Sequence, residues 1–213
     1  MIKAERGRNR QHGTVIDKVV LLACGRWALS PKAREYRALQ RLRQFLRRWA
    51  GHEAFGATSG PLFFITNTRG IITLKNVKAS AASGVLVKAG VDRWGRTGSN
   101  GGNAVFTADG ETLAGDLVAD AGCSVRATLQ NGTTLAGAIK DAALTIDATS
   151  KWTVTADSTL TTLTDAGGVS GLSISNIVGN GHNVHYDAGL AANKWLEGKT
   201  YTLSGGGQLL PKS

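Results

Sequence analysis

Carboxylates gathered in one short segment are the first residues of this sequence that suggest chemistry. Calcium binds six to eight oxygen ligands, and clustered carboxylates can supply them. A lyase acting on an acidic polysaccharide would need such a calcium site with a Lys or Arg base beside it. Single Asp residues next to Gly also form turns, and we favour that interpretation. The four candidate calcium ligands are Asp109, Glu111, Asp116 and Asp120.

A glycine-rich stretch, RWGRTGSNGGN (93–103), suggests carbohydrate binding. Trp94 lies between Arg93 and Arg96, so its indole could stack on a sugar ring while the guanidinium groups contact an anionic group. The alternative, which we favour, is that Trp94 packs over the edge of the fold.

Histidine and cysteine offer weaker candidates. On a strand, His182 and His185 would point to opposite faces and could not share a metal ion, whereas His185 and Asp187 would share a face. The sequence contains no G-x-S-x-G, H-E-x-x-H, P-loop or metal-spaced Cys/His cluster. Cys24 and Cys123 could form one disulfide if the fold brings them together, but two cysteines do not make a disulfide scaffold. Nucleophilic and zinc chemistry are therefore disfavoured.

The composition is that of a folded protein. The 213 residues are 42% hydrophobic and 19% charged, which argues against disorder throughout the chain. No run approaches 18 apolar residues, so no transmembrane helix is predicted, and the 28 glycines lack the three-residue period of collagen.

The charge divides the chain into two parts. Residues 1–57 hold 13 basic and 4 acidic residues, whereas residues 58–213 hold 12 and 11, so most of the net charge of +10 lies in the first part. We therefore predict a basic segment at 1–57 and a second domain at 58–213. Only the basic segment has the excess of positive charge that suggests binding to nucleic acid or an anionic membrane.

A basic amphipathic helix is predicted at about 31–50. Ser30 can cap its first amides, and Pro31 fits the first helical position. Apolar residues recur at steps of three and four, with arginines on the opposite side. We expect the apolar stripe to dock as a cap on the following domain, and anion binding is the alternative. The candidate anion-binding residues are Arg34, Arg37, Arg41 and Arg48.

The remainder of the chain reads as short strands. They are rich in Val, Ile, Thr and aromatic residues and mostly end at Gly, Asn or Asp. A sandwich, a barrel or a solenoid could contain such strands. The predicted strands are 62–67, 70–77, 83–90, 103–110, 124–132, 143–149 and 151–157.

Internal repetition favours the solenoid. DGETLAGDL (109–117) aligns with NGTTLAGAI (131–139), and ADSTLTTL (156–163) is a looser third copy, so the pattern recurs at a period of about 22 residues. A period in the low twenties without a helix suits one coil of a parallel β-helix, in which each coil stacks on the one before it. We therefore predict an interior ladder of Leu113, Leu135 and Leu160.

The segments PLFFITNTRGIITLKNV, ASGVLVKAG, RWGRTGSNGGNAVFTADGETLAGDLVAD, LTIDATSKWTVTADSTLTTLTDA and SNIVGNGHNVHYDAGL also carry a resemblance. Over about residues 60–210 the chain is similar to the C-terminal coils of bacterial extracellular right-handed β-helix proteins. That group resembles adhesin-type surface proteins and polysaccharide-binding modules, so the resemblance implies a β-helix outside the cell or at its surface. The run Val19–Ala23 is too short for a signal peptide, and the basic segment stands where coils would be expected.

These observations together predict an all-β right-handed parallel β-helix with an N-terminal helical cap. The expected function is non-enzymatic adhesion or self-association at a cell surface. The alternative is a carbohydrate-binding module or a lyase-like protein acting on acidic glycans. No cofactor is expected, apart from the calcium considered above.

Overall fold

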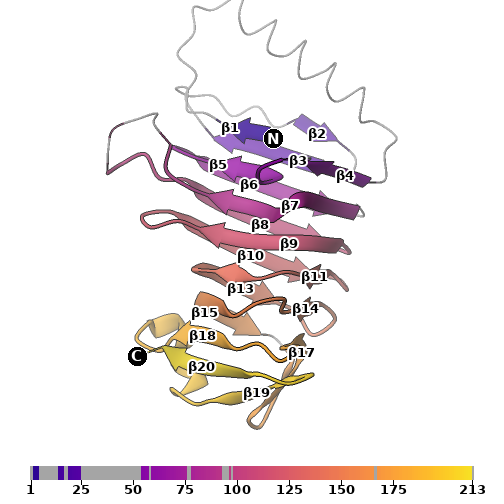
Figure 1. Ribbon diagram of the computed structural model, residues 1–213, viewed down its shortest axis with the longest axis vertical. Helices are drawn as coiled ribbons and strands as arrows, with labels where there is room; N and C mark the ends of the chain where they lie inside the picture. The colour runs from indigo at the N-terminus through magenta and orange to yellow at the C-terminus, as the bar shows by residue number, and fades with distance from the viewer. Residues whose placement is uncertain are drawn as a thin grey trace, which may run out of the picture.

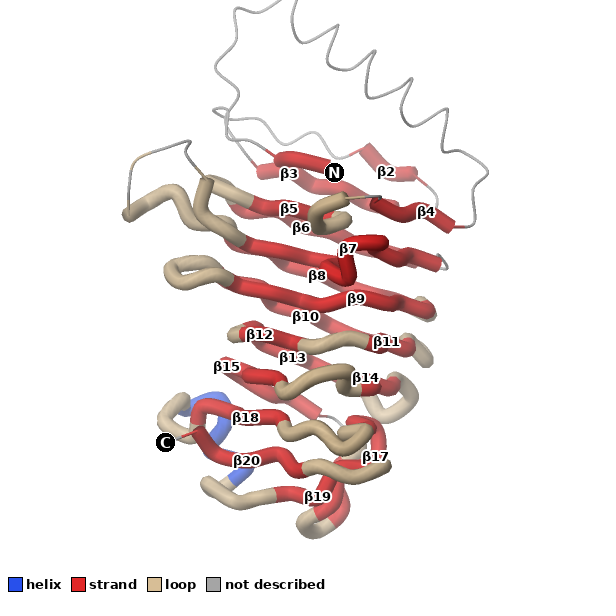
Figure 2. Tube along the Cα trace, in the orientation of Figure 1, coloured by secondary structure: helices blue, strands red, loops and turns tan. Residues whose placement is uncertain are grey.

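The computed structural model consists mainly of β-strands, with one short 3-10 helix, η1 (Ala191–Leu196), among the residues it describes (Figure 1, Figure 2). The strands form one sheet and stack along the long axis of the molecule. Most pair in parallel, so the prediction of an all-β, mostly parallel fold is confirmed. The described residues are 2–4, 14–16, 19–24, 54–57, 59–75, 78–92, 96, 98–165 and 167–212.

Row one is the first of three rows of stacked parallel strands. It contains β6 (Arg69–Lys75), β8 (Asn103–Asp109), β10 (Ser124–Gln130), β13 (Ala142–Ile146) and the end of β15 (Ser158–Asp165). Alternate residues point inward, and the register places each inward side chain on its counterpart in the next strand. One inward file, at most 2% exposed, consists of Ile72, Phe106, Ala127, Leu144 and Leu163.

Row two follows row one in the chain. It contains β4 (Ala54–Ala57), the start of β7 (Lys78–Ala89), the start of β9 (Thr112–Ala119), β11 (Thr134–Ala136), β14 (Lys151–Thr153) and β17 (Ser173–Val178). Its pairs confirm the first two copies of the sequence repeat, because Leu135 is the register partner of Leu113 and both are buried.

The predicted place of Leu160 in this ladder is wrong. Leu135 is followed in row two by Trp152, and Trp152 is followed by Ile177. The first of these steps along the chain is shorter than the step from Leu113 to Leu135, and the second is longer. Leu160 is buried, but it pairs with Ala142 and with Tyr186 in other strands. The prediction assumed a nearly constant period, whereas the connections at the corners change length from one circuit to the next.

Row three completes each circuit. β5 (Phe63–Ile65), the end of β7, the end of β9 and β12 (Ile139–Lys140) pair in parallel, and β15, β18 (Val184–Asp187) and β20 (Gln208–Lys212) form a second parallel series. All seven strand segments predicted from the sequence overlap a strand of the structure.

A repeated glycine makes the corner between rows two and three. A Cβ on Gly137 would lie 2.2 Å from the carbonyl oxygen of Gly115, which belongs to the preceding circuit. Only glycine permits this approach of two backbones. The Gly115 and Gly137 match in the sequence repeat therefore reflects close packing of successive corners.

The C-terminal end of the stack is closed. β19 (Tyr201–Ser204) pairs with β17 and, antiparallel, with β20, which also pairs with β18. Both strands therefore have a partner on each side. In row one, side chains of η1 make the hydrogen bonds to Leu163 that a further strand would otherwise make. Asn193 Oδ1 accepts from the Leu163 amide at 2.9 Å, and Trp195 Nε1 donates to the Leu163 carbonyl at 2.9 Å.

Antiparallel pairing also occurs at the other end. β3 (Val19–Cys24) pairs antiparallel with β6 and with β2 (Thr14–Ile16), whereas β1 (Ile2–Ala4) pairs in parallel with β5. Near the C-terminus, β16 (Val169–Ser170) pairs antiparallel with β17. The predicted helix at 31–50 lies outside the described residues, so both its capping role and the boundary at 57/58 stay predictions.

Candidate functional site

The outward side of row one carries five threonines in register, which we call the threonine file. Each is the direct partner of the next in the parallel ladders, and each is half-buried or exposed. Adjacent strands lie about 4.8 Å apart, so the file extends over roughly 19 Å. Its members are Thr73, Thr107, Thr128, Thr145 and Thr164.

The hydroxyl groups of the threonine file are not used by hydrogen bonds within the described part of the chain. Other threonine hydroxyls are used inside the structure: Thr133 Oγ1 donates to the Ala108 carbonyl at 3.0 Å, and Thr159 Oγ1 donates to Asp141 at 3.0 Å. Among the described residues, no hydroxyl of the threonine file has a hydrogen-bond partner. The file therefore presents a row of methyl groups and unused hydroxyls at a constant spacing.

Two further outward files flank the threonines. On one side Ile71, Val105 and Ala143 are half-buried and Arg126 is exposed. Polar residues stand on the other side, where β6, β8 and β10 end: they are Lys75, Asp109 and Gln130. The surface of row one thus combines apolar contact area with hydrogen-bonding groups.

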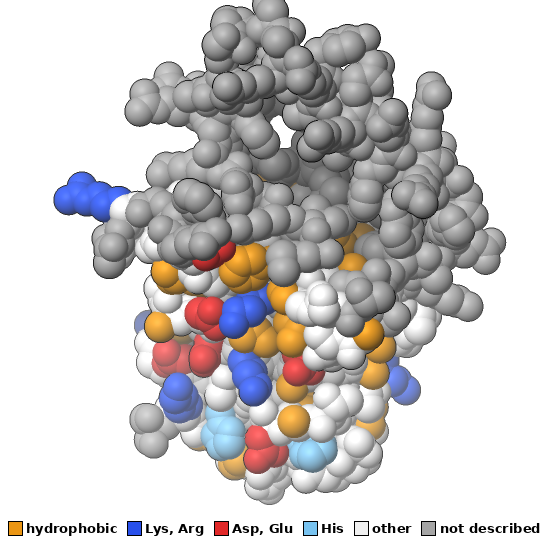
Figure 3. Space-filling view, turned by 45° about the horizontal axis from the view of Figure 1, so that its top comes forward, with side chains coloured by type: hydrophobic (Ala, Val, Ile, Leu, Met, Phe, Trp, Pro, Cys, Tyr) orange, Lys and Arg blue, Asp and Glu red, His pale blue; other side chains and the backbone are white. Residues whose placement is uncertain are grey.

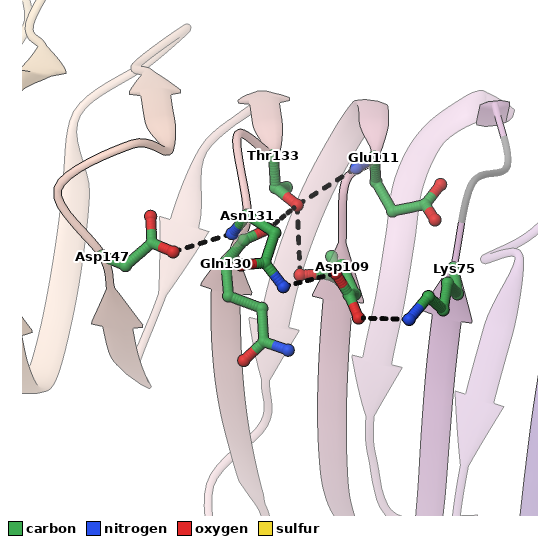
Figure 4. Close-up of polar contacts among 8 residues, drawn as sticks. Lys75, Asp109, Glu111, Gln130, Asn131, Thr133 and Asp147 are labelled. Atoms are coloured by element: carbon green, nitrogen blue, oxygen red, sulfur yellow. Dashed lines mark hydrogen bonds and ion pairs between the residues drawn. The ribbon is translucent and has the colours of Figure 1, made fainter.

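A polar network holds the corner between rows one and two (Figure 4). Asn131 Nδ2 donates to Asp109 Oδ1 at 2.7 Å, and Lys75 Nζ lies 3.3 Å from Asp109 Oδ2. The hydrogen bond from Asn131, together with Lys75, lowers the pKa of Asp109 below its ordinary value. Asp109 therefore links three consecutive circuits at this corner.

Asp147 performs the same task one circuit later. Its Oδ2 accepts from the Asn131 amide at 2.7 Å, and its Oδ1 accepts from the amides of Thr149 at 3.0 Å and Ser150 at 2.8 Å. Partial burial opposes ionisation, but these hydrogen bonds outweigh it and lower the pKa of Asp147 to about 2. The ionised carboxylate is a structural acceptor for turn amides.

Buried hydroxyls complete the inner side of this corner. Thr133 Oγ1 accepts from the Glu111 amide at 3.1 Å, and the Thr133 amide donates to Ser150 Oγ at 3.1 Å. Thr133 and Ser150 are at most 2% exposed. Since a buried amide without a partner is costly, these hydroxyls stabilise the turn rather than serve a reaction.

The four predicted calcium ligands do not come together. Asp116 Oδ1 accepts from the Ala138 amide at 2.7 Å, and Asp120 forms an ion pair with Lys88 at 3.1 Å. Within the ranges that the structure describes, no group of three or more His, Cys, Asp or Glu residues could hold a metal ion. The predicted calcium site of Asp109, Glu111, Asp116 and Asp120 is therefore not formed, because the residues are distributed around one circuit.

His185 and Asp187 share the outward face of β18, as predicted, but no ion pair joins them among the described residues. His182 Nδ1 lies 3.7 Å from Asp157 Oδ1, whereas Asp187 Oδ1 accepts from the Gly189 amide. Cys123 is a free, half-buried thiol, so it forms no disulfide with Cys24.

Two predicted groups lie wholly or partly outside the described residues. Arg96 is described and exposed. The other two residues of the predicted carbohydrate-binding group, Arg93 and Trp94, lie outside the described residues. So do the predicted anion-binding residues Arg34, Arg37, Arg41 and Arg48.

Charges of opposite sign are mixed on the surface. In the view of Figure 3, acidic and basic side chains lie next to one another on the described part of the molecule. The ion pair of Lys88 with Asp120 is one example. On this face, the arrangement favours a ligand without a high charge of one sign.

Sequence reasoning missed the threonine file although a signal for it exists. In each strand of row one, a threonine directly follows the residue of the inward file that ends at Leu163, as in Ile72-Thr73 and Phe106-Thr107. The strand register is needed to see that these threonines align. Comparisons of the chain with family models, with curated proteins and with solved structures found no match. No helix in the described part of the chain is long and apolar enough to span a membrane.

Proposed function

We propose that this chain is a right-handed parallel β-helix that acts as a non-enzymatic adhesion module outside the cell or at its surface. Three rows visited in the same order by successive circuits support the β-helix, and long parallel ladders support a rigid binding platform. The location is inferred from the resemblance to extracellular β-helix proteins.

The threonine file is the observation that carries the proposed binding function. An array of five register-matched threonines with unused hydroxyls suits a ligand that repeats along its own length. A polysaccharide chain is such a ligand, since its rings offer both apolar faces and hydroxyl groups. The flanking apolar side chains Ile71 and Val105 would contact the rings, and Arg126 would bind a hydroxyl or an acidic substituent.

The corner carboxylates support a binding role over a catalytic one. Asp109, Asp116 and Asp147 each accept hydrogen bonds from amide groups of a neighbouring circuit. Their ionisation and position serve the stacking of circuits. An acid or base in a lyase would instead be directed toward a substrate.

Adhesion by the side of the stack is favoured over end-to-end self-association. β19 and β20 each have partners on both sides, so the C-terminal end offers no unpaired edge in these strands for another copy. Contacts along the rows therefore remain the proposed mode of binding.

The test is a glycan array and a pull-down on insoluble polysaccharides, each with calcium and with a chelator. A variant with Thr107, Thr128 and Thr145 replaced by Val keeps the shape of the file but removes three hydroxyls. We expect its affinity for the bound glycan to fall about tenfold or more, because each hydrogen bond contributes about 0.5–1.5 kcal/mol.

The matched control replaces Thr112 and Thr134 by Val. These threonines are exposed and register-matched in row two, so binding should be unchanged. Absence of binding to every polysaccharide, or equal losses in both variants, would contradict the proposal. Sedimentation at several concentrations separates adhesion from self-association.

A further inference from the structure

Two turns of this protein share an Asn-Gly sequence and one backbone conformation. Asn131 and Gly132 have φ of 57° and 78°, and Asn180 and Gly181 have φ of 53° and 81°. In both turns the amide after the glycine donates to the carbonyl before the asparagine, at 3.3 Å and 2.9 Å respectively. Such a turn with two positive φ values favours Asn-Gly. The chain thus contains two copies of one local structure in different surroundings.

The first turn is held at the backbone nitrogen that would attack in a ring closure and at the side-chain nitrogen that would leave. Asn131 Nδ2 donates to Asp109 Oδ1 at 2.7 Å, which holds the side-chain amide. The Gly132 amide donates to Thr149 Oγ1 at 2.9 Å, which holds the backbone nitrogen. The backbone amide of Asn131 donates to Asp147 Oδ2 at 2.7 Å. Any reaction between the side chain of Asn131 and the nitrogen of Gly132 must first break these hydrogen bonds.

The second turn is anchored only on its two sides. The Gly179 amide donates to the Ser204 carbonyl at 2.8 Å, and the Asn183 amide donates to Asp157 at 3.0 Å. At the tip, neither the Asn180 side chain nor the Gly181 amide has a hydrogen bond to a described residue, and both residues are exposed.

A neighbouring segment of the same chain, residues 205–207, leaves the tip of the second turn exposed. Gly205, Gly206 and Gly207 pass beside it, and a Cβ built on Gly206 would lie 3.7 Å from the Gly181 nitrogen. Glycines place no side chain over the reacting atoms. The Asn180 side chain is therefore free to turn toward the following peptide nitrogen.

We propose that Asn180 is a site of spontaneous deamidation, from which Asn131 is protected although it lies in the same kind of turn. The Gly181 nitrogen loses its proton and attacks Cγ of Asn180. The new C–N bond closes a succinimide ring, the bond from Cγ to the side-chain nitrogen breaks, and ammonia leaves. Water then opens the ring at either carbonyl, giving aspartate or isoaspartate. The product places a new negative charge in the turn that precedes His182.

The test is incubation of the full chain at neutral and mildly alkaline pH, followed by peptide mapping with mass spectrometry. Deamidation at Asn180 should be about tenfold faster than at Asn131, because the first turn must break hydrogen bonds before reacting. The rate at Asn180 should rise with pH, since the attacking nitrogen must lose a proton. Separation of aspartate from isoaspartate peptides identifies the succinimide route.

Two variants make the comparison decisive. Thr149→Val removes the acceptor of the Gly132 amide and should accelerate deamidation at Asn131 several-fold, leaving Asn180 unchanged. Asn180→Gln should abolish fast deamidation at that position, because ring closure from the longer side chain is slow. Equal rates at Asn131 and Asn180 in the parent chain, or no effect of Thr149→Val at Asn131, would overturn the proposal.

Discussion

The stacking of Leu135 on Leu113 can be tested by a double-mutant cycle. Leu135 is 1% exposed and lies between Leu113 and Trp152 in row two. Leu135→Ala removes three carbon atoms, worth about 2.4 kcal/mol of burial at about 0.8 kcal/mol each. A cavity then adds to the loss, so the free energy of unfolding should fall by about 2–5 kcal/mol.

The register determines which second substitution couples to this one. Leu113→Ala enlarges the same cavity, so the two losses should deviate from additivity by about 0.5–3 kcal/mol. Leu160→Ala lies in a different file, paired with Ala142, and its loss should add to that of Leu135→Ala within about 0.5 kcal/mol.

The assay is urea unfolding of each single and double variant, followed by circular dichroism and compared at equal m-values. Thr134→Ala, an exposed neighbour in the same strand, is the control and should change the stability by less than about 0.5 kcal/mol. The stacking order would be refuted if Leu135 coupled to Leu160 and not to Leu113. A loss for Leu135→Ala as small as that of a surface substitution, below about 0.5 kcal/mol, would show that this position is not interior.

Three further predictions concern the corners and the C-terminal end. The folded pKa of Asp147 is lowered from 3.8 to about 2, so its contribution to stability is complete above about pH 4 and disappears as the pH falls through 2. The urea midpoint of the parent chain should fall over this pH range, and the contribution of Asp147 to that fall should be absent in Asp147→Asn. Gly137→Ala should prevent folding or severely destabilise the protein, since its Cβ would lie 2.2 Å from a backbone oxygen. Gly132→Ala has open space around its Cβ, so thermal unfolding should show a loss of only about 1–2 kcal/mol in stability, caused by its φ of 78°. Asn193→Ala should lower stability by about 1–3 kcal/mol, because the buried amide of Leu163 loses its acceptor; equal thermal midpoints would contradict this.

Local sequence patterns predict the strands of row one best and the stacking of circuits only in part, because β9, β11, β12 and all strands from β15 to β20 lie outside the predicted segments. A high content of Val, Thr and Phe, together with closing turn residues, identifies the segments that form β8 and β10, and the structure shows that each has one interior face. The match of Leu113 with Leu135 succeeds because that circuit keeps its glycine corner at the same place. The next circuit is shorter, so extrapolation of the period selects Leu160 where the structure has Trp152. No local sequence pattern indicates that change in the length of the circuit.

The candidate site is harder to predict because it depends on alignment between circuits. Thr107 and Thr128 are ordinary β-formers when each strand is considered alone, and only the register makes them neighbours. The acidic residues mislead in the opposite way. Asp109 and Asp120 are close in sequence, yet they lie at opposite ends of the segment formed by the end of β8 and β9. Proximity along the chain therefore overstates their proximity in space.

Unequal circuits have a consequence for how such a chain can change over evolutionary time. Successive circuits of different lengths return to the same file at Leu135, Trp152 and Ile177, so the difference in length is taken up where the chain turns. A hairpin would lose its register by one inserted residue, since every following side chain would change face. Here an insertion or deletion at a corner leaves the rows before and after it in place. The corners can therefore change in length, except where close packing fixes a residue as at Gly137, whereas a register shift within a row would misalign the inward and outward files of the circuits that follow.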